Sequence, residues 1–232
     1  MTAPTEAPWI TVRAAPTCPR CFGTLRPPSV WSSAWRCGVH GAVVPFHTRR
    51  PSAEALDLVR KDARVPFWLP WPLPPGWLVT GFGDAGDERS GARAGVVACS
   101  GPSVTQGPAD LLIVAEEPGL GLGAAYAGLP GPDPGPGFDA GPPGAKVDAR
   151  GHPTALWWVE GRPDRAVYVG EAMGDWLWII GWPAEAGCLV ALTQLSLRDL
   201  REHDQELDLP FGAVTPRLGA EIQGLRTLPR LR

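Results

Sequence analysis

The sequence predicts an α+β protein: a small N-terminal module followed by a mainly antiparallel sheet domain with a C-terminal helix. Three observations lead to this fold class. Cysteine and histidine pairs recur near the N-terminus, short β-prone segments alternate with turn residues in the middle, and leucines recur at helical spacing after the last of these segments. A chain of 232 residues has room for one small module and one ordinary domain.

The N-terminal module contains the ligand pattern of a tetrahedral zinc site. Cys18 and Cys21 are separated by two residues, as are Cys37 and His40, and fifteen residues lie between the two pairs. This spacing lets two tight turns each aim two side chains at one ion. A closed Cys3His site leaves no position for water, so we predict a structural Zn²⁺ in a zinc ribbon at residues 13–48.

The histidine ligand has an alternative. His40 completes a compact second turn, whereas His47 lies beyond an expected strand, so we favour His40. An accidental Cys-x-x-Cys pair or a redox dithiol is less consistent with a second pair at the same spacing. Because a segment of about 35 residues buries too little surface to fold alone, the metal must supply much of the module's stability.

The charge distribution is uneven, although the formal net charge is only −3. No acidic residue occurs between positions 7 and 53, where six arginines are found: Arg13, Arg20, Arg26, Arg36, Arg49 and Arg50. This asymmetry is compatible with nucleic-acid contact or with docking onto an acidic protein partner. The alternative is that the ribbon packs on its own acidic domain, and no defined aromatic and basic strip favours nucleic acid.

A short helix and a proline-rich strap are expected at residues 49–76. Ser52 can cap a helix that runs to about Arg64. Residues 65–77 then alternate prolines with one phenylalanine and three tryptophans, which excludes a helix or a central strand. The segment could be an exposed ligand for a partner's aromatic groove, but exposure of so much aromatic surface favours a strap laid over the domain.

The main domain is expected at residues 77–208. Six strands are predicted, at 77–82, 95–100, 110–116, 156–160, 166–171 and 176–182. The last of these is apolar on both faces and is therefore expected at the centre of the sheet. From Pro183 the leucine spacing predicts the C-terminal helix, and residues 209–232 are expected to form a basic, weakly ordered tail.

A long loop rich in glycine and proline is predicted at residues 119–151, where sixteen of 33 residues are one or the other. Its first glycines, after an apolar strand, invite comparison with a phosphate-binding loop. The lysine of that motif is missing, and Glu116 and Glu117 would repel a phosphate. An enzyme would most naturally use a pocket near this loop, lined by Glu116, Glu117 or Asp175.

No catalytic residue can be assigned. Cys99 with a distant His152 lacks any nucleophile motif. Glu160, Glu171 and Asp175 flank turns, where solvated carboxylates are usual, and His203 lies at a charged helix end. The tryptophans could line a ligand pocket between strap and sheet, although core positions are more usual for them.

Five segments of the chain resemble an uncharacterised family of actinobacterial proteins. They are Cys18-Pro-Arg-Cys-Phe-Gly23, Trp35-Arg-Cys-Gly-Val-His-Gly41, Pro70-Trp-Pro-Leu-Pro-Pro-Gly-Trp77, Ala98-Cys-Ser-Gly-Pro102 and Gly121-Leu-Gly-Ala-Ala-Tyr-Ala-Gly128. The similarity spans residues 16 to 218. It implies a bacterial cytoplasmic setting and the four metal ligands, but no substrate or reaction. At the level of the fold alone, the ribbon also resembles zinc knuckles that contact proteins and nucleic acids.

These observations favour a zinc-stabilised, non-enzymatic interaction or regulatory protein. A ligand-binding protein or enzyme with a site near residues 119–151 is the alternative, and nucleic-acid binding through the arginines is a further one. The N-terminus has no basic segment followed by an apolar one, and the most apolar stretch, at 176–192, is interrupted by glycine, proline and glutamate. We therefore expect a cytoplasmic protein with neither a secretory signal nor a membrane span.

Overall fold

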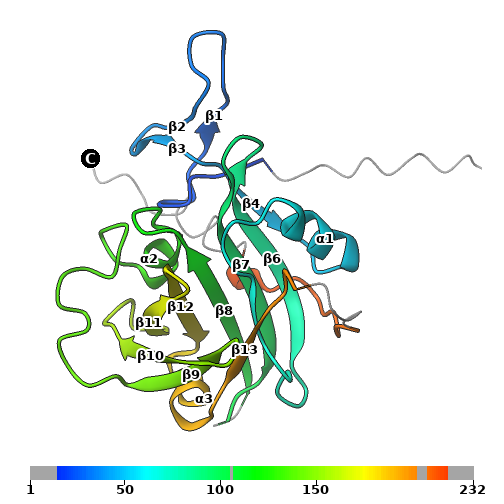
Figure 1. The fold of residues 1–232 in the computed structure, drawn as a ribbon, viewed down its shortest axis with the longest axis vertical. Coiled ribbons are helices and arrows are strands. Elements are labelled where there is room, and N and C mark those ends of the chain that lie inside the picture. The colour runs from blue at the N-terminus through cyan, green and yellow to red at the C-terminus, as the bar shows by residue number, and fades with distance from the viewer. Residues whose placement is uncertain (1–14, 105–106, 203–207, 219–232) are drawn as a thin grey trace, which may run out of the picture.

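The computed structural model describes residues 15–104, 107–202 and 208–218 (Figure 1). The chain forms a three-stranded sheet near the N-terminus and a ten-stranded sheet that carries most of the remaining chain. The small sheet has the order β1-β2-β3, with β1 at Leu25–Arg26, β2 at Trp35–Cys37 and β3 at Gly41–Val43. Both of its strand pairs are antiparallel.

The large sheet confirms the prediction of a mainly antiparallel sheet. Its spatial order is β4-β6-β7-β8-β12-β11-β10-β9-β13-β5. The strands are β4 Phe46–Arg49, β5 Trp68–Pro70, β6 Leu78–Asp87, β7 Gly91–Pro102, β8 Pro108–Glu116, β9 Ala145–Ala149, β10 His152–Trp158, β11 Ala166–Ala172, β12 Asp175–Trp182 and β13 Ser196–Asp199. One pair of described strands, β9 and β13, is parallel, so the sheet is mixed.

Strands β8 and β12 lie at the centre of the large sheet and are covered on both faces. They pair in antiparallel register, with Ile179 opposite Ile113. Alternate residues of β8 enter two separate cores: Leu111 and Ile113 pack in one, while Leu112 and Val114 pack in the other. The apolar residues on both faces of the predicted strand 176–182 are explained by this two-sided burial.

Helix α1 (Ala53–Lys61) and the proline-rich segment cover the first core. The Ser52 hydroxyl accepts a hydrogen bond from the Ala55 N–H at 3.1 Å, which caps the helix, and Leu56 is buried. Within the proline-rich segment, Phe67 and Trp68 have at most 1% of their surface exposed. This segment also contributes β5, which pairs with β13.

The C-terminal helix is shorter than the leucine spacing predicts. A 3-10 turn (η1, Ala184–Ala186) and helix α3 (Gly187–Leu192) follow β12, and the chain then enters β13. Leu195 and Leu197 are buried at alternate positions of an extended chain, whereas Leu192, part of the expected helical stripe, is 78% exposed. Leucine spacing alone is compatible with either a helix or a strand over this segment. Residues 196–199 form a strand because they pair with β9 on one side and β5 on the other.

The predicted glycine- and proline-rich loop contains helix α2 (Leu122–Ala127) and strand β9, and side chains anchor the segment between them. Asp133 Oδ1 accepts hydrogen bonds from the Gly119 N–H at 2.7 Å and from the Trp176 indole at 2.8 Å. The Phe138 ring packs edge-on against Trp157 and Trp176. The segment is therefore folded onto the sheet.

The predicted tail begins with residues that pack along the large sheet. The Val79 N–H donates to the Pro210 carbonyl, the Gly212 N–H donates to the Val79 carbonyl, and Leu218 is 1% exposed. Residues 219–232 lie outside the described residues, as do Arg13 and His203. Among the described helices, none combines the length and apolarity needed to cross a membrane.

Candidate metal centre

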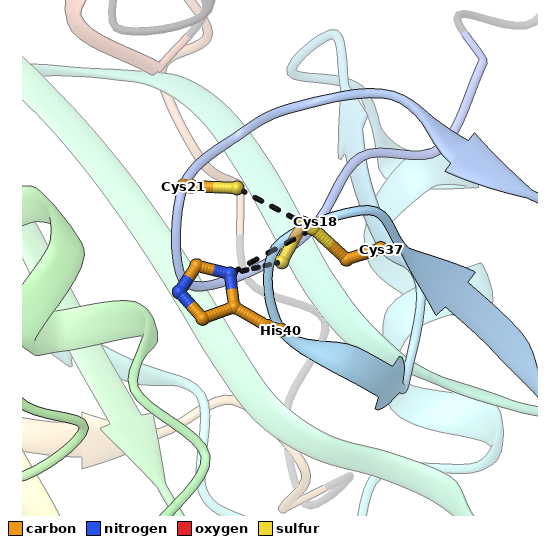
Figure 2. A group of neighbouring side chains, drawn as sticks. All are labelled: Cys18, Cys21, Cys37 and His40. Atoms are coloured by element: carbon orange, nitrogen blue, oxygen red, sulfur yellow. Dashed lines mark hydrogen bonds between the residues drawn. The ribbon is translucent and has the colours of Figure 1, made fainter.

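The two predicted ligand pairs come together in space. Cys18 and Cys21 lie on the turn before β1, while Cys37 and His40 lie at the turn between β2 and β3. Their sulfur and imidazole nitrogen atoms all lie within 4.8 Å of one another. Figure 2 shows the four side chains pointing toward a common centre. This group could hold a metal ion.

The spacing of these atoms fits a tetrahedral metal site. With Zn–S bonds of about 2.3 Å and a Zn–N bond of about 2.05 Å, a regular tetrahedron has S···S edges of about 3.8 Å and S···N edges of about 3.6 Å. The Cys21 and Cys37 sulfurs are 3.7 Å apart. The His40 Nδ1 atom lies 3.6 Å from the Cys18 sulfur and 3.7 Å from that of Cys37. These three distances have the lengths of tetrahedron edges, and every donor–donor distance in the group is within 4.8 Å.

Backbone hydrogen bonds support the sulfur atoms. The Cys37 sulfur accepts the Val39 N–H at 3.4 Å. The Cys18 sulfur likewise accepts a hydrogen bond from the Arg20 backbone N–H, and the Cys21 sulfur accepts one from the Gly23 backbone N–H. Each cysteine thus has a donor two residues after it in the chain. Such N–H donors stabilise thiolates, which are the form that binds metal.

The surroundings of the three cysteine thiols shift their pKa values in different directions. Burial raises the pKa of Cys18 to about 12 and also raises that of Cys21. Burial acts in the same direction on Cys37, but backbone N–H groups at His40 and Val39 outweigh it and lower its pKa to about 6. Without a cation, the cluster therefore favours one thiolate over three, and a bound metal would be needed to stabilise the others.

His47 lies apart from this cluster. It belongs to β4, and its Nδ1 atom is 3.7 Å from Asp84 Oδ2. Arg49 donates to the other carboxylate oxygen of Asp84 at 2.8 Å. Burial alone would raise the pKa of Asp84, but hydrogen bonding and charge from His47 and Arg49 hold it below its usual value. The structure thus brings His40, and not His47, to the three cysteines.

The first cysteine turn also docks onto the large domain. The Arg20 guanidinium donates to the carbonyl oxygens of Gly119 and Leu120, at 2.6 and 3.0 Å. The Phe22 ring, 4% exposed, lies 4.8 Å from the Tyr126 ring of α2. Sequence patterns did not identify this contact, because its partners are about 100 positions apart in the chain.

The predicted arginine set divides into two groups. Arg20 and Arg49 bond within the protein, as described above, which matches in part the alternative that the ribbon packs on its own domain. Arg26, Arg36 and Arg50 are exposed. Arg26 and Arg36 are direct cross-strand partners in the β1–β2 pair. The exposed positive charge of the small sheet is therefore concentrated on its outer hairpin.

The carboxylates proposed for an enzyme site have other contacts. Glu116 is fully buried and accepts the N–H groups of Leu122 and Gly123, at 2.6 and 3.0 Å. Glu117 forms an ion pair with Arg93 at 2.6 Å. Burial, followed by the nearby charge of Glu117, raises the pKa of Asp175 to about 6. Two of the three groups are therefore committed to structural contacts.

The remaining residues considered for catalysis do not lie together in the structure. Cys99 in β7 is fully buried, which raises its pKa to about 12. His152 lies in β10, and strands β8, β12 and β11 separate the two strands in the sheet. Glu160 and Glu171 are exposed, and Trp68, Trp178 and Trp182 are fully buried core residues.

Comparison with known proteins identifies a family but no reaction. The profile of a family of unknown function, DUF6758, matches residues 12–218. The chain belongs to this family. Searches of curated proteins and of solved structures found no match. The predicted membership of an uncharacterised family is thus confirmed, while the actinobacterial origin stays a prediction.

The structure also contains a surface hollow that the sequence did not predict. It has a volume of about 1480 Å³ and lies between the β1–β2 hairpin, β4, α1 and the β6–β7 turn. Trp35, Leu58 and Asp84 contribute to its walls. The hollow is built by segments distant in the chain, so no local motif could reveal it.

Proposed function

We propose that Cys18, Cys21, Cys37 and His40 bind one structural Zn²⁺. Support comes from the donor set, from three donor–donor distances that match the edges of a tetrahedron, and from a backbone N–H that donates to each sulfur. With four protein ligands, zinc would have no open position, so its contribution would be to hold the two turns together. Iron can also occupy tetrahedral thiolate sites, so the metal must be identified directly.

Native mass spectrometry of the full-length protein, purified without chelator, tests this proposal. We expect one zinc per chain in the wild-type protein and in His47→Ala. In His40→Ala the affinity should fall by more than the roughly 10–100-fold that loss of an outer-shell partner costs, because a direct ligand is removed. Iron in the wild-type protein, or zinc retained equally by both variants, would contradict the assignment.

We further propose that the chain is a zinc-stabilised, non-enzymatic interaction or regulatory protein whose ribbon presents a contact surface. The observation that carries this function is the exposed pair Arg26 and Arg36. Like charges directly opposite each other destabilise an antiparallel strand pair, so a hairpin with only a structural role gains nothing from them. An acidic partner surface would neutralise both.

Capture of partners by the tagged full-length protein in cells of its source tests this role. We expect Arg26→Glu/Arg36→Glu to lose its enriched partner by at least about tenfold while keeping its zinc. The matched control Lys61→Glu/Lys146→Glu introduces the same charge change outside the ribbon and should retain the partner. Equal capture by both variants would remove the ribbon from this function.

An enzyme with a site near residues 119–151 is the weaker hypothesis, because Glu116 and Glu117 are used in structural contacts. A cytoplasmic location and an actinobacterial origin stay predictions drawn from the sequence.

A further inference from the structure

The tip of the β1–β2 hairpin exposes two large apolar side chains. Val30 is 94% exposed and Trp31 is 93% exposed, the highest values for large apolar residues in the described part of the chain. Figure 1 shows the loop between β1 and β2 projecting beyond the body of the molecule. Exposed apolar groups that extend from a fold in this way mark interaction sites when they are gathered together.

Hydrogen bonds close the tip in one conformation. The Ser29 N–H donates to the Ser32 carbonyl at 2.7 Å, and the Ser32 N–H donates to the Ser29 carbonyl at 3.1 Å. The Trp31 N–H also donates to the Ser29 hydroxyl at 3.3 Å. Val30 and Trp31 are the two central residues of this closed turn, so little backbone entropy is lost when they are buried.

Within the hairpin itself, charged side chains occur only behind the tip. Residues 27–35 contain no charged side chain, and Arg26 and Arg36 face each other immediately behind this stretch. Arg26 lies four positions before Val30 and Arg36 lies five positions after Trp31, so each arginine is at most about 13–17 Å along the chain from the tip. The hairpin therefore presents an apolar tip, a neutral section and then a pair of positive charges.

From this arrangement, we propose that the hairpin inserts Val30 and Trp31 into the surface of an anionic lipid bilayer. Membrane-surface elements bury apolar groups about 5–10 Å into the boundary between headgroups and acyl chains. Tryptophan is favoured at that boundary, and arginines behind it are attracted to anionic headgroups. This inference rests on the proposed role of the ribbon as a contact surface and assigns that surface a partner.

A bilayer fits the tip better than a nucleic acid does. A base can stack on Trp31, but Val30 has no face on which a base can stack, and the uncharged section separates the tryptophan from both arginines. Both tip side chains can be buried among acyl chains without a complementary pocket, and the arginines then lie at the level of the anionic headgroups. A single hairpin predicts weak, reversible binding that depends on anionic lipid.

Vesicle flotation of the zinc-loaded, full-length protein tests the proposal. The probes are vesicles of two parts phosphatidylcholine to one part phosphatidylglycerol, and vesicles of phosphatidylcholine alone. We expect the protein to float with the anionic vesicles only, and less so as salt is raised. Trp31→Ser should lower the partition coefficient by about tenfold, and Trp31→Phe should retain most of it. Arg26→Glu/Arg36→Glu should lower it by at least about 30-fold.

The control is Trp158→Ser, which removes a tryptophan that is 57% exposed and lies on β10, away from the ribbon. It should leave flotation unchanged. An unchanged zinc content in every variant shows that the ribbon has kept its fold.

Three results would overturn the lipid proposal: no flotation of the wild-type protein, equal flotation of wild-type and Trp31→Ser, or binding to an oligonucleotide in place of vesicles. Failure of the lipid proposal can be distinguished from failure of the proposed contact function of the ribbon. If vesicles fail while the protein partner is still lost in Arg26→Glu/Arg36→Glu, the contact role of the ribbon stands and only the lipid assignment falls.

Discussion

Glu116 shows how burial changes the role of a single carboxyl group. At the end of β8 it has no exposed surface, and its two oxygens accept the first N–H groups of α2. Burial raises its pKa from 4.5 to about 8, because the loss of hydration outweighs the stabilisation of the charged form by these hydrogen bonds. The side chain joins a central strand to a short helix.

This raised pKa predicts a pH-dependent stability. The folded protein binds the Glu116 proton more tightly than the unfolded chain does, so the free energy of unfolding should fall as the pH rises from about 4.5 to about 8. The effect is of the order of a few kcal/mol. Glu116→Gln cannot ionise and should remove this part of the slope in urea unfolding at several pH values. Glu171→Gln, at an exposed position, is the control, and parallel profiles for wild-type and Glu116→Gln would refute the assignment.

At the scale of elements, the small sheet is attached to the large domain by three kinds of contact. Thr17 and Phe46 exchange backbone hydrogen bonds at 2.8 and 2.9 Å, which links the first cysteine turn to β4. Arg20 donates to the carbonyls before α2, and Phe22 packs against the rings of Phe46 and Tyr126, which also contact each other. The ribbon is therefore held on the domain by its first turn, while its hairpin extends outward.

Removing the Phe22 ring should detach the ribbon without removing its metal. Because the side chain is buried in the second core, Phe22→Ala should destabilise the protein by about 3–5 kcal/mol. We expect faster proteolysis within the ribbon, a lower urea midpoint and unchanged zinc content. Val39→Ala, at an 81% exposed site on the same ribbon, should change stability by less than about 0.5 kcal/mol. A rigid ribbon in Phe22→Ala would show that the other contacts are sufficient.

Across the whole molecule, the cores that stabilise the sheet are distinct from the metal centre. Both cores are formed mainly by the large sheet and the helices that pack on it, and Phe22 joins the second core from the first cysteine turn. The proposed metal would therefore organise the ribbon, whereas apolar burial on two faces stabilises the large domain.

Zinc removal should accordingly affect one part of the molecule. With a chelator, we expect Cys18, Cys21 and Cys37 to become reactive toward a thiol reagent, so that three more thiols per chain react. Cys99, which is fully buried, should stay protected. Far-ultraviolet circular dichroism should retain the strand signal at moderate temperature. Loss of that signal on chelation would show instead that the sheet depends on the metal.

The sequence by itself determined the features that depend on local spacing. The two Cys/His pairs come together in space, Ser52 caps a helix, and each of the six predicted strands of the main domain overlaps an observed strand. Several of these strands are longer than predicted, and the strand predicted at 156–160 is shifted to His152–Trp158. Two residues between ligands permit one turn geometry, and apolar residues on both faces require a central strand. The choice of His40 over His47 followed from the same short-range geometry.

Only the tertiary structure decided the features that depend on distant partners. Residues 196–199 form a strand because β9 and β5 lie on either side of them, although the leucine spacing also suits a helix. Glu116 is buried and accepts the first N–H groups of α2 because that helix packs over the end of β8. Arg20 contacts the large domain because the fold places the carbonyls of residues 119 and 120 within hydrogen-bond distance of its guanidinium. Spacing along the chain encodes turns, caps and strand faces, whereas burial and hydrogen-bond partners are determined by contacts between segments far apart in sequence.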